Sequence, residues 1–154
     1  METLGKEIFQ DIINVYNETL KNDDKLRQLR IVAEKLLGGL MKNYSEKVYG
    51  LNARACFILD KHPDAKREED HFFGFIRLAN RAAHTMPLDA KDGEVASCIK
   101  VLSAITSIFT KVEAPHTVKD IYEEKELPDL RRAWFANKSH VPEVHAIITS
   151  VGEK

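Results

Sequence analysis

Residues 75–84 read FIRLANRAAH, a stretch in which strong hydrogen-bond donors stand among small and apolar residues. At about 100° per residue, an α-helix gathers the apolar residues on one side: Phe72, Ile76, Ala79, Ala83 and Met86. The opposite side carries the donors and one aromatic ring: Phe73, Arg77, Asn80, Arg81 and His84. A helix with two such faces buries the apolar one against other helices. The stretch therefore predicts one helix of a bundle, with a donor stripe on its outer side.

The sequence on either side of this stretch predicts four more amphipathic helices. Their apolar residues recur at intervals of three and four, the periodicity of a helix with one buried face. We expect these helices near residues 3–20, 24–44, 51–62 and 89–112, a short capped segment over 45–50, and a start at Asp64 for the FIRLANRAAH helix. Short connections place consecutive helices antiparallel. The predicted fold is all-α, an up-and-down bundle of four to five helices over residues 1–113.

Capping residues and glycines mark the second and last helices of this bundle. Asp23 or Asp24 can cap the second helix, and Asp89 or Asp92 the last, because an aspartate side chain accepts hydrogen bonds from free backbone N–H groups. The pair at residues 38–39, Gly-Gly, lies inside the second helix, where each glycine costs about 1 kcal/mol relative to alanine. Close approach of a neighbouring helix and a kink both explain the pair.

Residues 114–154 lose the long helical period and are expected to form a short irregular extension or the start of a following domain. Within them, residues 127–137 predict a short helix, and residues 144–151, VHAIITSV, are the one good strand candidate. A lone strand needs a partner for its backbone, so it adds to another chain or begins the next domain of a longer protein. We favour the second interpretation.

A mixed cationic and aromatic cluster lies in the same extension, at Arg131, Arg132, Trp134 and Phe135. Such mixtures bind single-stranded nucleic acid by stacking and charge. A small helix that docks its aromatic rings on the bundle explains the cluster as well, and we favour that interpretation.

Composition argues against several classes of protein. The formal net charge of −1 gives no overall field for nucleic acid or a membrane, so an anion site has to be built from local positive charge. Cys56 and Cys98 are far apart, which fits unpaired thiols in a reducing compartment. No apolar run approaches the roughly 18 residues of a membrane helix. We therefore expect a cytoplasmic protein without a membrane partner.

Metal and cofactor sites are not expected. The histidines other than His84 show no metal-ligand spacing, and the sequence has no glycine-rich phosphate loop followed by Lys-Ser/Thr. Any chemistry at the donor stripe therefore has to come from side chains alone.

FIRLANRAAH resembles the IR-x-x-N-x-A-A-H segment of a HEPN-like domain that is often attached to restriction and helicase proteins. Arg77 and His84 match the R-x(4–6)-H signature of the HEPN superfamily of helical domains. Residues 29–42, LRIVAEKLLGGLMK, resemble an earlier helix of that group with the pattern R-x-x-x-E-x-L-L, here beginning at Arg30 and including Glu34. The resemblance covers residues 24–112.

This resemblance implies a helical bundle that often forms a homodimer, with the two motif helices facing each other. In active members the Arg and His form a metal-independent ribonuclease site, whereas other members serve as binding or assembly modules. The implied context is phage defence, or a larger restriction or helicase protein. Many active members carry a polar residue directly after the Arg, where this chain has Leu78.

The donor stripe suits RNA cleavage on chemical grounds as well. His84 is the residue type that moves a proton at neutral pH, and Arg77 and Arg81 supply planar cations for phosphate oxygens. Asn80 can hold an imidazole tautomer or a phosphate oxygen. A symmetric dimer would supply a proton acceptor and a proton donor together. A solvated polar face and a dimer contact without chemistry remain alternatives.

Two further residues have candidate roles at the stripe. Phe73 can stack on a base, although an interface or core-edge position is the interpretation we favour. Glu34 can orient Arg77 or His84, although a helical ion pair with Arg30, four residues earlier, is favoured.

Overall fold

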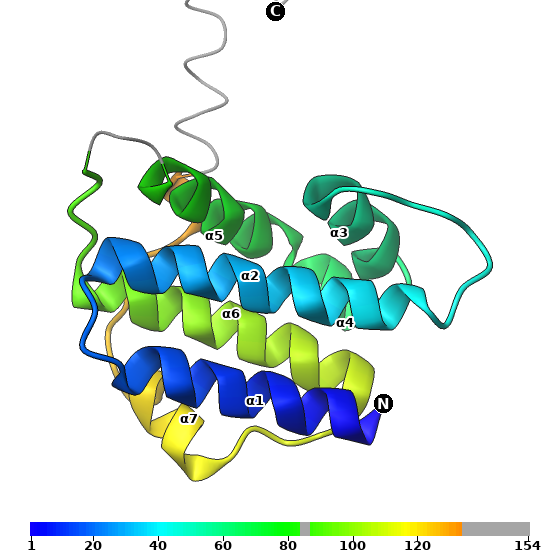
Figure 1. Ribbon diagram of the computed structural model, residues 1–154, viewed down its shortest axis with the longest axis horizontal. Coiled ribbons are helices and arrows are strands. Elements are labelled where there is room, and N and C mark those ends of the chain that lie inside the picture. The colour runs from blue at the N-terminus through cyan, green and yellow to red at the C-terminus, as the bar shows by residue number, and fades with distance from the viewer. Residues whose placement is uncertain (84–86, 134–154) are drawn as a thin grey trace, which may run out of the picture.

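The computed structural model describes residues 1–83 and 87–133, and this part of the chain forms a helical bundle without strands (Figure 1). Its helices are α1 (Glu2–Asn17), α2 (Asn22–Met41), α3 (Leu51–Leu59), α4 (Pro63–Arg67), α5 (Glu69–Ala82), α6 (Asp92–Thr110) and α7 (His116–Tyr122). The all-α prediction is confirmed. The strand candidate at 144–151 lies outside the described residues.

Helix α2 is the centre of the bundle. It packs against α1, α3, α5 and α6, and Figure 1 shows it between α1 and α5 and in front of α6. Four of its leucines have no solvent exposure: Leu26, Leu29, Leu36 and Leu37. Full burial of a leucine side chain stabilises a fold by about 1.5–3 kcal/mol, so this apolar stripe contributes strongly to the core.

The helix α2 runs through both of its glycines to Met41, and Gly39 reflects the close approach of α1. A Cβ added at Gly39 would lie 2.7 Å from Cδ2 of Leu4, and one added at Gly38 would lie 3.5 Å from Nη1 of Arg54. Gly39 therefore makes room for the side chain of α1 that packs on it.

Two predicted helix boundaries are wrong. The helix expected from Asp64 through His84 is divided at Glu68, whose φ of −89° and ψ of 0° leave the helical region between α4 and α5. No proline or glycine marks this break. The capped segment expected over 45–50 is not helical, and the chain there forms bends and irregular structure.

The predicted aspartate caps are also wrong. Lys21 is the N-cap of α2 and Lys91 the N-cap of α6. At α6 the capping hydrogen bond comes from the third helical position, where Glu94 Oε1 accepts the backbone N–H of Lys91 at 2.8 Å. The aspartates near these ends have other partners.

By length and composition alone, helix α6 could span a membrane. However, 61% of its apolar 18-residue stretch is buried inside the bundle. Its two buried threonines bond within the helix: Thr106 Oγ1 donates to the Leu102 carbonyl and Thr110 Oγ1 to the Thr106 carbonyl, each at 2.7 Å. A core helix of a soluble protein has this length and composition.

The chain after Glu113 packs on the bundle through α7 and through residues 128–133. Ala114, Val118, Ile121 and Leu130 belong to the buried core. Ser97 Oγ, on α6, donates to the Pro128 carbonyl at 2.8 Å. The described part of the expected irregular extension thus contains a helix, and a following domain stays a prediction.

Candidate functional site

The donor stripe of α5 lies at the surface, as its sequence pattern predicts. Phe73, Arg77 and Asn80 are half-buried and Arg81 is exposed. The opposite face is buried through Phe72, Phe75, Ile76, Leu78, Ala79 and Ala82, whereas Ala83, expected on that face, is exposed at the helix end. Met86 lies outside the described residues. Leu78, the residue after Arg77, is 4% exposed and belongs to the core.

Arg77 and Arg81 differ from most of the other arginines in having no anionic partner in the described ranges. Four arginines pair with carboxylates, namely Arg27, Arg30, Arg67 and Arg131, and Arg54 Nε donates to the Val48 carbonyl at 2.8 Å. The Nε of Arg77 is buried and has no hydrogen-bond partner among residues 1–83 and 87–133. Leaving such a donor unsatisfied costs about 1–3 kcal/mol, so an acceptor that reached it would be bound favourably.

The spacing of these two arginines suits an oxyanion with several acceptors. Four residues along a helix correspond to a rise of about 6 Å on one face, so both guanidinium groups can reach one phosphate or two adjacent ones. Guanidinium donors match phosphate oxygens in pairs. The side chain of Asn80, between them, makes no hydrogen bond within the described part of the chain and adds a donor and an acceptor.

His84 lies outside the described residues, so its position relative to Arg77 stays a prediction. The helix that precedes it ends at Ala82, and the N–H of Ala83 donates to the Asn80 carbonyl at 3.1 Å. The structure therefore brings Arg77, Asn80 and Arg81 together on one helix face.

The chain that follows His84 is held by the start of α2. The Asp23 carboxylate accepts the backbone N–H groups of Leu88 at 2.8 Å, Asp89 at 3.2 Å and Ala90 at 2.9 Å. Burial opposes ionisation of Asp23, but these three hydrogen bonds outweigh it and lower its pKa. Asn22 Nδ2 also donates to the Ala90 carbonyl at 3.1 Å. This anchor fixes where the connection from α5 re-enters the bundle.

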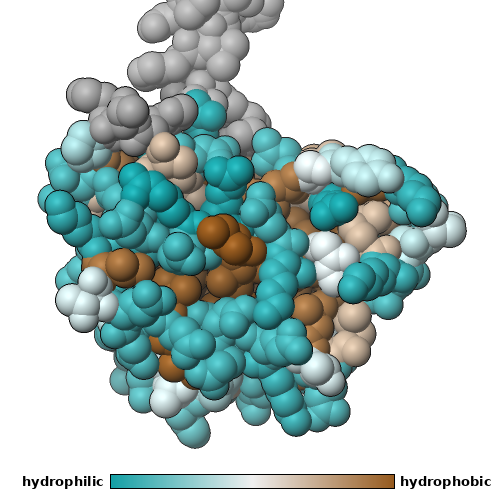
Figure 2. All heavy atoms as spheres, viewed as in Figure 1, coloured by the Kyte–Doolittle hydropathy of each residue, from teal (hydrophilic) through white to brown (hydrophobic). Residues whose placement is uncertain are grey.

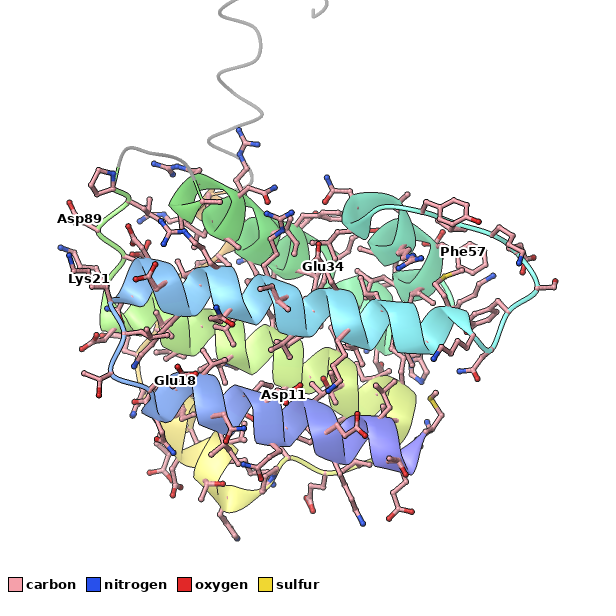
Figure 3. All side chains as sticks on the ribbon, viewed as in Figure 1. Asp11, Glu18, Lys21, Glu34, Phe57 and Asp89 are labelled. Carbon is pink, nitrogen blue, oxygen red and sulfur yellow. The ribbon has the colours of Figure 1, made fainter. Side chains whose placement is uncertain are left out.

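Glu34 projects from α2 at the side where α3 and α5 lie (Figure 3). Its Oε2 is 3.7 Å from Nη2 of Arg30, and both side chains are partly exposed. Within the described residues Glu34 forms no ion pair with Arg77, so the structure brings Glu34 to Arg30 and does not bring it to the α5 arginines.

Phe73 lies at the edge of the core. Its ring centroid is 6.3 Å from that of Phe72, in an edge-to-face arrangement with an interplanar angle of 82°. The ring is half-buried and packs against the buried cluster. It gives the donor stripe an apolar border.

A second polar group, which sequence reasoning missed, surrounds His71 on the side of α5 that faces residues 125–130. His71 Nδ1 is 3.7 Å from Glu68 Oε1, and its Nε2 is 3.7 Å from Asp129 Oδ1. These residues line a pocket of about 350 Å³ together with Lys100 and Lys125. Hydrogen bonds from Arg131 lower the pKa of Asp129 to about 2. The pocket mixes both signs of charge, and no cluster of three metal-ligating side chains occurs in the part of the chain that the structure describes.

Comparison of the chain with protein-family models, with curated proteins and with solved structures finds no match. The resemblance to the HEPN superfamily is one of sequence motifs in α2 and α5, and membership of that superfamily stays a prediction.

Proposed function

We propose that the outer face of α5 binds the phosphate groups of RNA, and that the protein is a HEPN-like, metal-independent endoribonuclease. The observation that carries the proposal is the pair Arg77 and Arg81, one turn apart on α5 and without a carboxylate partner among residues 1–83 and 87–133. Arg27, Arg30 and Arg67, by contrast, each pair with a carboxylate of their own helix. A half-buried and an exposed arginine, neither with a carboxylate partner among the described residues, suit an external anion.

In the proposed reaction His84 takes the proton of a 2′-hydroxyl, whose oxygen attacks the adjacent phosphorus. The bond to the 5′-oxygen breaks, which leaves a 2′,3′-cyclic phosphate and a 5′-hydroxyl. Arg77 and Arg81 bind the phosphate oxygens as negative charge builds on them, and Asn80 orients one of these oxygens. Phe73 borders the bound strand.

The leaving 5′-oxygen needs a proton that one histidine cannot supply while it acts as the base. A homodimer with its α5 helices facing each other provides a second His84 as the acid. Ile31 on α2 is 56% exposed, and Figure 2 shows an apolar area bordered by hydrophilic side chains on the face formed by α1, α2 and α5. Apolar surface of this kind supports the proposed dimer contact.

A second candidate function is a non-catalytic dimerisation or docking module of a larger nucleic-acid-processing protein. The exposed Ile31 on α2, together with the apolar area in Figure 2, favours it, because a contiguous exposed apolar surface marks a protein contact and does not bind phosphate. For either function we propose a cytoplasmic location. The biological context would be phage defence, or a larger restriction or helicase protein.

Binding of fluorescein-labelled single-stranded RNA in EDTA tests the phosphate face, with His84→Ala as the background so that the RNA stays intact. Arg77→Ala and Arg81→Ala should each weaken binding about tenfold, as expected for loss of a charge-assisted contact of roughly 1.5 kcal/mol. Arg67→Ala is the matched control, because Arg67 is an exposed arginine that pairs with Asp64 away from the stripe. Equal affinities for all four proteins, with circular dichroism unchanged, would contradict the proposal.

A further inference from the structure

Helix α5, which carries the donor stripe, packs against α2, which carries Arg30. Helices α2 and α5 pack side by side and run in opposite directions (Figure 1). Asp23, at the start of α2, binds the backbone of Leu88, which follows the end of α5. Arg30 lies two turns beyond Asp23, on the same half of the α2–α5 contact as Arg77.

Arg30 resembles Arg77 in its surroundings. Its side chain is 38% exposed, and its Nε is buried without a hydrogen-bond partner in the described part of the chain. The one carboxylate beside it, that of Glu34, is 3.7 Å from Nη2, which is beyond hydrogen-bonding distance. The charge of Arg30 is therefore only loosely compensated.

The neighbouring pair on α2 behaves differently. Arg27 and Asp24 make a direct hydrogen bond as well as an ion pair. An external phosphate would have to break that bond, whereas at Arg30 it would displace only a loosely placed carboxylate. Arg30 is the better second cation for an anion that is already bound at α5.

We infer that Arg30 extends the phosphate-binding face from α5 onto α2, and that Glu34 competes with RNA phosphate for Arg30. The inference rests on the proposed function and adds two residues to that site. A phosphate close to Arg30 would also be close to the Glu34 carboxylate, and like charges repel. Glu34 therefore weakens RNA binding, whereas a residue that orients the site would strengthen it.

A second cation is available to Glu34 when RNA displaces it. Glu34 and Arg54 line the same depression of about 240 Å³, together with Leu37 and Leu51. Arg54 Nη1 also lies over Gly38, one turn after Glu34. The carboxylate can turn toward this guanidinium, so displacement from Arg30 does not leave it without a positively charged neighbour.

A double-mutant cycle on the full chain tests the inference. His84→Ala serves as the background so that RNA stays intact, and the affinity for a short fluorescein-labelled single-stranded RNA is measured in EDTA. Glu34→Gln should tighten binding roughly two- to fivefold, the size of an exposed ion-pair effect, and Arg30→Gln should weaken it. In the presence of Arg30→Gln, Glu34→Gln should change the affinity no more than Glu18→Gln does.

Glu18→Gln is the matched control, because it removes the same charge from an exposed position beyond the end of α1, away from Glu34 (Figure 3). The inference is overturned if Glu34→Gln leaves the affinity unchanged, changes it only as much as Glu18→Gln does, or keeps its full effect with Arg30→Gln. If Arg77→Ala fails to weaken binding in the same assay, the proposed function falls and the inference falls with it. If Arg77→Ala weakens RNA binding but Glu34→Gln leaves it unchanged, the inference is overturned and the proposed function stands.

Discussion

The Asp23 carboxylate at the start of α2 accepts the backbone N–H of Ala90 at 2.9 Å, from a residue 67 positions later in the chain. The same carboxylate binds the N–H groups of Leu88 and Asp89, and Asp89 has a positive φ of 57°. These hydrogen bonds hold the connection between α5 and α6 against the start of α2. They tie the chain that follows the donor stripe to α2, the helix at the centre of the bundle.

Asp23→Asn should destabilise the fold by about 1–3 kcal/mol, because an amide oxygen accepts these three hydrogen bonds less strongly than a carboxylate and its NH₂ group faces backbone donors. Urea unfolding at neutral pH measures the change. Asp24→Asn is the control, since Asp24 pairs only with Arg27 at the surface and should cost less than 1 kcal/mol. Equal costs for the two variants would mean that the anchor does not stabilise the fold.

The hydrogen bonds to Asp23 also predict how the stability of the fold depends on pH in the acid range. Because the folded-state pKa of Asp23 lies below the ordinary value of 3.8, its contribution is complete above pH 3.8 and is lost as the pH falls through the folded-state pKa. The free energy of unfolding of Asp23→Asn should therefore fall less between pH 5 and pH 2 than that of the wild type. Parallel curves for the two proteins would contradict the assignment.

Gly74→Ala should detach residues 128–133 from α5 or strain the contact. A Cβ at this position would collide with the Leu130 carbonyl and would lie 2.7 Å from its carbon atom, which is backbone that cannot rotate away. Overpacking of this kind costs about 1–3 kcal/mol, more than alanine regains through helix propensity. Limited proteolysis after Arg131 or Arg132 should become faster.

Gly93→Ala is the milder control for that experiment. A Cβ there would lie 3.1 Å from Cδ of Pro128, a side-chain atom of the same segment. Proteolysis that is accelerated equally by both variants, or by neither, would count against the tight backbone contact at Gly74.

Ile31→Asp should convert the proposed dimer into a monomer, because a charge placed at a buried apolar contact has no partner there. Light scattering of the wild type and the variant measures the mass. Tyr49→Asp is the control, since Tyr49 is 73% exposed in the segment between α2 and α3. A wild type that is monomeric at all concentrations, or an Ile31→Asp variant that stays dimeric, would exclude a dimer through this face.

RNA binding should depend on salt in proportion to the phosphates that are neutralised. For single strands, log K falls with log salt concentration by about 0.7 for each phosphate contact, so Arg77→Ala should reduce that slope by roughly this amount. Arg67→Ala should leave the slope unchanged. A weaker affinity with an unaltered slope would show that Arg77 supports the fold and does not contact phosphate.

The helical periods and the polar face of α5 could be predicted from sequence because both depend on residues close together in the chain. The division at Glu68 could not be, since no proline or glycine interrupts the pattern there. The partners of Asp23 could not be predicted, because a carboxylate near a helix start is ordinarily a cap, and nothing local indicates that the backbone N–H groups of residues 88–90 donate to it. Glu34 and Arg30 were paired correctly by spacing, but their competition with RNA depends on how α2 packs against α5.

The central claim is tested most directly by incubating the full chain with single-stranded RNA in EDTA and analysing the ends of the products. The proposed mechanism predicts cleavage that yields 2′,3′-cyclic phosphate and 5′-hydroxyl ends and that is abolished by His84→Ala, while the helical circular-dichroism spectrum of the variant is unchanged. Cleavage that is unaffected by His84→Ala, or the complete absence of cleavage by a dimer that binds RNA, would contradict it.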